Sequence, residues 1–94
     1  SMGPVQWLTF NVLNLFFSVV IINAILSWLV AFDVVNTRNK LVGTIADVSD
    51  RITSPVLNPI RKVVPAMGGV DISPIILWLI IGFLQRFVVP LIPF

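Results

Sequence analysis

Hydrophobic and polar positions divide the chain into three parts, of which the first is a long apolar stretch. Residues 5–32 are mostly apolar and contain no charged side chain. A helix of this length reaches about 40 Å, more than the roughly 30 Å hydrocarbon core of a bilayer. Trp7 and Trp28 lie about 31 Å apart along it, which matches the aromatic belts of two membrane interfaces. The pattern therefore predicts a first transmembrane helix over residues 5–32.

A second apolar stretch occupies residues 73–92 and predicts a second transmembrane helix. Ser73 is suited to the N-cap and Pro74 to the first helical position. Arg86 falls near the far end, where its side chain can extend to the lipid headgroups. Trp78 lies near the start and shares an interface with Trp28 if the helices form an antiparallel hairpin. We therefore expect Trp7, Trp28 and Trp78 to be interfacial anchors.

The segment between these stretches has the periodicity of an amphipathic helix over residues 39–54. Four apolar residues are spaced i, i+4, i+7 and i+11, and form one narrow stripe: Leu41, Ile45, Val48 and Ile52. Asp47 and Arg51 lie away from the stripe, at the spacing of a helical ion pair.

Proline at position 55 predicts that this helix ends at Ser54, because the residue before proline avoids the α region. A basic loop rich in Pro and Gly then follows over residues 55–72. Within it we expect a short helical segment interrupted at Pro59, and a turn at residues 65–71 whose glycines permit positive φ. The predicted fold is a single all-α membrane domain over residues 1–94, a hairpin of two transmembrane helices around an interfacial helix.

Composition supports lipid as the solvent of this chain. Hydrophobic residues make up 57% and charged residues 11% of its 94 residues, and so short a chain has too little interior to bury that much apolar surface. Five of the six basic residues lie between the predicted spans: Arg38, Lys40, Arg51, Arg61 and Lys62. The positive-inside rule therefore predicts a cytoplasmic loop, with both termini outside.

The residue types present give little support to an enzyme. The chain has no Cys and no His, so thiol chemistry, cysteine-ligated metals and imidazole acid–base catalysis are excluded. For haem ligation only Met2 and Met67 remain, and methionines are usually apolar filler. We predict no catalytic residues, no metal site and no cofactor. No run of like charges indicates nucleic-acid binding.

Polar and small residues inside the first predicted span suggest helix association. One group lies near the loop, where we expect a helix–helix interface with a second copy or another membrane protein: Asn23, Ala24, Ser27 and Ala31. A second group shares another face and would line the pore if several copies formed a channel: Asn11, Asn14 and Ser18.

Each charged residue considered in the loop has either a binding or chemical role or a purely structural one. Arg51, Arg61 and Lys62 either bind anionic lipid headgroups or an acidic partner, or only set the topology. Asp71 comes just before a helix start, where we expect it to bind a nearby N–H or favour the helix dipole rather than to act chemically.

The long loop motif resembles a known family. Arg51-Ile-Thr-Ser-Pro-Val-Leu-Asn-Pro-Ile-Arg-Lys is followed by Pro65-Ala-Met-Gly-Gly-Val-Asp-Ile-Ser-Pro, and this is similar to the signature of the YggT/YlmG family. Ala24-Ile-Leu-Ser-Trp also resembles the end of that family's first helix. The sequence departs from the pattern at Ser54, where an acid is common, and at Asn58, which is often basic.

The resemblance implies a small integral membrane protein of a family widespread in bacteria and chloroplasts, and with it we expect a location in a bacterial inner membrane. Its members are linked to osmotic tolerance, to division-site or nucleoid organisation and, in plastids, to maturation of c-type haem. We therefore expect a scaffold or accessory protein that self-associates or docks on another membrane complex. A homo-oligomeric channel or transport component in osmotic adaptation is the alternative.

Overall fold

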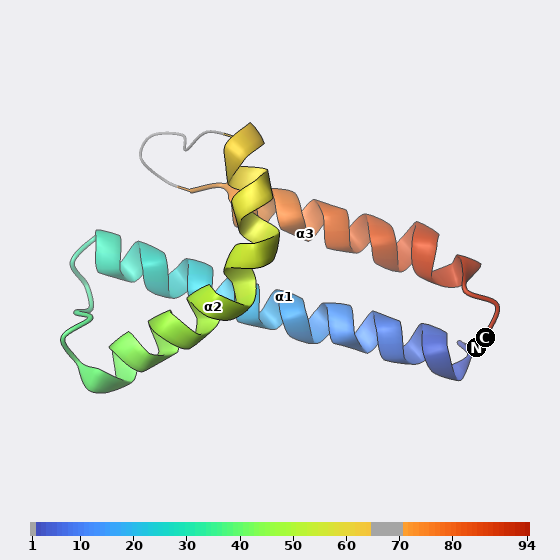
Figure 1. The fold of residues 1–94 in the computed structure, drawn as a ribbon, viewed down its shortest axis with the longest axis horizontal. Coiled ribbons are helices and arrows are strands. Elements are labelled where there is room, and N and C mark those ends of the chain that lie inside the picture. The colour runs from blue at the N-terminus through green and yellow to red at the C-terminus, as the bar shows by residue number, and fades with distance from the viewer. Residues whose placement is uncertain (1, 65–70) are drawn as a thin grey trace.

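The computed structural model describes residues 2–64 and 71–94, which form helices and connecting turns. In these ranges there is no β-strand, so the predicted all-helical class is confirmed. The elements are α1 (Pro4–Ala31), α2 (Lys40–Val63), α3 (Ser73–Phe83), a π-helical turn η1 (Leu84–Val88) and a 3-10 turn η2 (Val89–Leu91). α1 and α3 run side by side in opposite directions, with both termini at one end, and α2 crosses in front of α1 (Figure 1).

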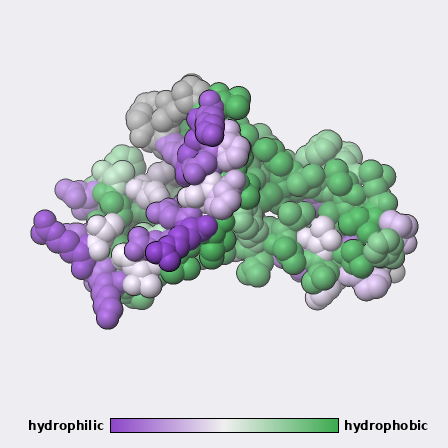
Figure 2. Space-filling model, in the orientation of Figure 1, coloured by the Kyte–Doolittle hydropathy of each residue, from purple (hydrophilic) through white to green (hydrophobic). Residues whose placement is uncertain are grey.

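Among the described residues, two helical segments are long and apolar enough to cross a membrane: α1 and Ser73–Leu91. Only 17% of the most apolar window of α1 and 22% of that of the second segment are buried within the chain, whereas a core helix of a soluble protein is mostly buried. Hydrophobic side chains cover the end of the molecule near the termini, and hydrophilic ones gather over α2 and the adjoining turn (Figure 2). Lipid is the environment that suits the apolar end.

α1 begins and ends with recognisable capping structures. Pro4 occupies the first helical position, where its missing N–H leaves no bond unmade. At the other end, the N–H of Asp33 donates to the carbonyl of Val30 at 3.1 Å, and that of Val34 to Leu29 at 2.9 Å. These two bonds form a Schellman motif, in which Asp33 adopts the left-handed conformation at φ 63°.

The C-terminal apolar segment changes its helical pitch before it ends. The N-cap is Ile72, so Ser73 is the first helical residue and Pro74 the second. The helix therefore begins one residue earlier than predicted from Ser73 as N-cap. Pro90 has no N–H to donate to the preceding turn, and the segment passes from α-helix through η1 into η2 around it. The Gln6 side chain then bonds the carbonyls of Pro90, at 3.3 Å, and Ile92, which joins the two apolar segments near the termini.

The predicted end of the central helix at Ser54 is wrong, and so is the loop from residue 55. α2 begins after Asn39, whose side chain accepts bonds from the N–H groups of the first turn, and continues through Pro55 and Pro59 to Val63. Its ribbon bends in this part (Figure 1), as helices do at proline. Leu57, between the two prolines, is fully buried, so tertiary packing holds the helix where local preference would end it. Residues 65–70 of the predicted turn, Met67 among them, lie outside the described residues.

Three faces run along α2, and the chain packs on only one of them. The packed face contains the buried Ser49, Thr53 and Leu57. The stripe predicted from periodicity (Leu41, Ile45, Val48 and Ile52) lies beside that face and is 40–68% exposed. A third face, the charged face, carries exposed polar and charged residues: Thr44, Asp47, Arg51, Asn58 and Lys62.

The apolar core is small and lies where the three helices meet. It consists of Val20 from α1, Leu57 from α2, and Leu77 and Ile81 from α3, each at most 5% exposed. Because these side chains come from all three helices, the core fixes α2 against the pair of apolar helices. Most other large apolar side chains remain exposed.

Candidate functional site

A buried polar contact joins α1 to α2 near the loop end of the molecule. Asn23 is 3% exposed, and its side-chain amide donates to Ser49 Oγ at 2.9 Å and to Asp50 Oδ1 at 2.6 Å. Ser27, one turn further along α1, donates to the backbone carbonyl of Asn23 at 2.8 Å. Bonds to a charged acceptor are the stronger kind, so the Asn23–Asp50 bond holds α2 in a defined place on α1.

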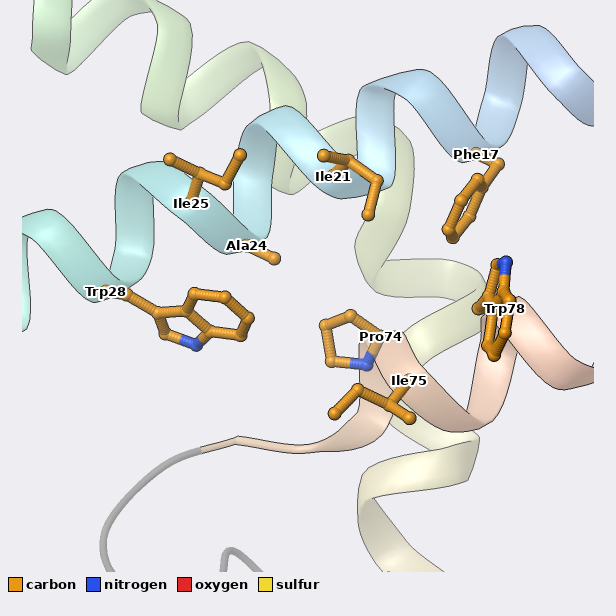
Figure 3. A pocket seen from close by; sticks show the side chains of 8 residues that line it. All are labelled: Phe17, Ile21, Ala24, Ile25, Trp28, Pro74, Ile75 and Trp78. Carbon is orange, nitrogen blue, oxygen red and sulfur yellow. The ribbon is translucent and has the colours of Figure 1, made fainter.

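For Asn23, this contact lies within the chain and not, as expected, with a second copy or another membrane protein. Asn23 and Ala24 do lie between helices, but the helices belong to the same chain: Asn23 faces α2, and Ala24 faces the start of α3 beside Pro74 (Figure 3). Ser27 and Ala31 are exposed. Sequence periodicity indicates a face suited to helix packing but contains no information on whether the partner is internal.

The basic residues of the predicted binding set have different surroundings. Arg61 Nε lies 2.7 Å from Asp71 Oδ2, the one ion pair among residues 2–64 and 71–94, and Arg61 Nη1 donates to Asn58 Oδ1 at 3.1 Å. Arg51 and Lys62 are exposed. The expected ion pair of Asp47 with Arg51 does not form, although both residues are among those described and both lie on the charged face of α2.

Asp71 links the end of α2 to the start of α3. Its Oδ1 accepts from the Ser73 backbone N–H at 3.0 Å and from Ser73 Oγ at 2.7 Å, while its Oδ2 binds Arg61. Partial burial on its own raises the pKa of Asp71, but the Ser73 bonds and the Arg61 guanidinium outweigh it and hold the pKa below its ordinary value. The expectation that Asp71 binds a nearby N–H is confirmed. Sequence reasoning missed Arg61 as its second partner.

The residues of the alternative pore face make bonds within the chain. Asn11 Nδ2 donates to the carbonyl of Trp7 at 2.8 Å, and Ser18 Oγ to that of Asn14 at 3.0 Å. Asn14 Oδ1 accepts from Gln85 Nε2 at 2.7 Å. The Asn14–Gln85 bond was not predicted, although an amide inside an apolar stretch was a signal for it.

Two of the predicted aromatic anchors line one apolar pocket between α1 and α3. Trp28 lies at one end of the pocket beside Pro74, and Trp78 lies at the other end beside Phe17 (Figure 3). Trp7 lies outside this pocket, near the termini, and is 58% exposed. The pocket lining contains almost no polar surface, so it is better suited to an apolar ligand than to a polar substrate.

The described residues contain no cluster of three or more acidic, His or Cys side chains that could hold a metal ion. The geometry supports contact surfaces: an exposed apolar stripe and an exposed charged face on α2, both held in place by buried bonds to α1. Together with the two apolar segments, this defines a small all-helical protein of the kind that resides in membranes.

The chain belongs to the CCB3/YggT family, whose sequence profile matches residues 2–92. It is 38% identical over 77 residues to an uncharacterized protein of Pseudomonas aeruginosa, a match that covers 82% of this chain and 35% of that protein. It is 39% identical over 67 residues to the uncharacterized protein YggT of Escherichia coli K12, covering 71% of this chain and 31% of YggT. The chain therefore spans about a third of the length of the curated relatives it matches. No solved structure matches it.

Proposed function

We propose that this protein is a membrane-anchored scaffold or accessory subunit that presents the charged face of α2 to another membrane complex or to a further copy of itself. α1 and the segment Ser73–Leu91 cross the bilayer as an antiparallel hairpin and hold α2 at its surface. The observation that carries the proposal is that α2 packs on the chain through the face that contains Ser49, Thr53 and Leu57. Its apolar stripe and its charged face therefore both remain available.

The apolar stripe of α2 is suited to the headgroup region of the bilayer. Leu41 and Val48 are 68% and 51% exposed, and apolar side chains at these positions gain from insertion among lipids. With the stripe toward lipid, the neighbouring charged face points to water. Arg51 and Lys62 on that face add attraction to anionic lipids or an acidic partner, about 1 kcal/mol per basic residue at a charged leaflet.

Topology follows from the distribution of charge. The excess of basic residues between the two spans supports a cytoplasmic α2 in a bacterial inner membrane, with both termini on the opposite side. This orientation also places the charged face where soluble and membrane-bound partners of the cytoplasm can reach it.

Site-specific photo-crosslinking in native membranes tests the docking proposal. A photoreactive residue replaces Thr44 or Arg51 on the charged face, and Leu15, which is 68% exposed on α1, serves as the lipid-facing control. We expect both α2 positions to give the same discrete protein adduct and position 15 to give lipid adducts. Lipid adducts from all three positions would contradict the proposal.

The channel alternative receives less support from the contacts of its candidate residues. Asn14 bonds to Gln85 of the same chain, and Asn11 and Ser18 bond to their own helix backbone. A flux assay in proteoliposomes tests it, because a channel would carry ions or small solutes faster than empty vesicles do.

A further inference from the structure

A groove on the outer face of the C-terminal apolar segment contains an arginine without a counter-ion. It is lined by Trp78, Leu79, Gly82, Phe83, Gln85, Arg86 and Phe87, and has a volume of about 380 Å³. Arg86 is exposed and makes no ion pair or side-chain hydrogen bond with any described residue. A cation within a spanning segment is costly and ordinarily has a partner.

The acidic residues of this chain are too far away to supply that partner. All four lie between the two spans, at positions 33, 47, 50 and 71, whereas Arg86 lies in η1, toward the end of the molecule where the termini meet (Figure 1). A second copy in the same orientation brings no acidic side chain to this level either. No acidic side chain among residues 1–94 therefore lies at the level of Arg86, and a bound anion is a suitable counter-ion for it.

The groove has the chemistry of a phospholipid site. Arg86 lies five residues before Leu91, roughly 7.5 Å along the segment, so its guanidinium can extend to the headgroups. Guanidinium groups bind phosphate with two parallel hydrogen bonds. From Arg86 the groove leads toward the bilayer centre past Phe83 to Trp78, over aromatic and aliphatic side chains that suit an acyl chain.

Gly82 makes the groove hollow without being needed for the fold. A Cβ at this position meets no other atom within 4 Å. Gly in a helix interior is less stable than Ala by roughly 1 kcal/mol, and no internal contact explains why it stands here. The missing side chain leaves room for a ligand between Trp78 and Arg86.

We propose that this groove binds one anionic phospholipid in the leaflet next to the termini, with the phosphate on Arg86 and an acyl chain over Gly82 and Phe83. The site lies at the opposite end of the molecule from the charged face of α2 and does not depend on the proposed docking function.

Quenching of Trp78 by brominated lipids tests the proposal. The variant Trp7→Phe/Trp28→Phe leaves Trp78 as the single reporter in the groove, and Trp28→Phe/Trp78→Phe leaves Trp7 as a control outside it. Each protein is reconstituted in phosphatidylcholine vesicles that contain either dibrominated phosphatidylglycerol or dibrominated phosphatidylcholine. At Trp78 we expect phosphatidylglycerol to bind about fivefold more tightly, the ratio that one basic residue contributes at an anionic surface, and at Trp7 a ratio near one.

Two further substitutions separate the headgroup contact from the acyl-chain contact. Arg86→Gln should reduce the ratio at Trp78 to about one, and Gly82→Leu should weaken quenching by both lipids because it fills the groove. A ratio of one in the unsubstituted groove, or an equal preference at Trp7, would overturn the proposal. Protection of Trp78 from both lipids would also overturn it, because a protein partner would then cover the groove.

Discussion

Asn23 of α1 donates a hydrogen bond of 2.6 Å to the carboxylate of Asp50 on α2, across the contact on which the position of α2 depends. The two residues are 27 positions apart in the sequence, so the bond fixes the tertiary arrangement rather than either helix alone. The same amide bonds Ser49, which leaves α2 little freedom to slide along α1.

Loss of the Asn23 amide should weaken this contact. In Asn23→Ala both α2 acceptors lose their donor, and we expect the free energy of unfolding to fall by about 1–2 kcal/mol. Titration with sodium dodecyl sulfate from mild detergent micelles, followed by tryptophan fluorescence, measures this change. Ser18→Ala is the matched control, because Ser18 is exposed and bonds only its own helix. Equal losses in the two variants would show that the α1–α2 bond has no special role.

A pair of leucines on α2 tests which of its faces the chain uses. Leu57 is fully buried in the three-helix core, whereas Leu41 is 68% exposed on the stripe. Leu57→Ala should lower the free energy of unfolding by about 2–5 kcal/mol, and Leu41→Ala should change it in micelles by less than about 0.5 kcal/mol. The same detergent titration gives both values. A large loss in Leu41→Ala would mean that the stripe packs on the chain itself.

The sequence was sufficient to predict the two apolar segments and the helical period between them, because uncharged length and spacing are properties of consecutive residues. It misplaced the end of α2 because proline rules are local, and the burial of Leu57 against Val20 and Leu77 is not. Periodicity identified the apolar stripe as the non-polar face of α2, but the stripe is not the face that packs on the chain. The face that packs carries Ser49 and Thr53, whose small size allows close approach of the helices.

The candidate site was only partly predictable for the same reason. Asn23 and Asp71 were recognised from residue type and position, but their partners Asp50 and Arg61 depend on how α2 crosses α1 and approaches α3. Residue spacing within one helix predicts which side chains share a face, but it does not predict which side chain of another helix they bond.

The start of α3 should lose stability in acid because of Asp71. Its folded pKa lies below the value of about 4 of an unfolded chain, so the stabilisation is fully present above that value. It is lost as the pH falls through the lowered folded pKa. Thermal unfolding in detergent at pH 7 and at a series of lower values measures this trend.

Asp71→Asn provides the control for that trend. The amide oxygen still accepts the bonds of Ser73, but the side chain no longer titrates, so the drop in melting temperature below pH 4 should become smaller. An unchanged drop would assign the acid sensitivity to the remaining aspartates.

The bond between Asn14 and Gln85 tests whether the polar residues of α1 pack within the chain or face neighbouring copies. A double-mutant cycle with Asn14→Ala and Gln85→Ala should give a coupling free energy of about 0.6 kcal/mol, with about 1.7 kcal/mol as the upper end for such bonds in membranes. The cycle of Asn11→Ala with Gln85→Ala should give none, because Asn11 bonds Trp7 instead. If Asn14 and Gln85 prove uncoupled, the Asn14 side chain is free to face neighbouring copies. That result would support the channel alternative.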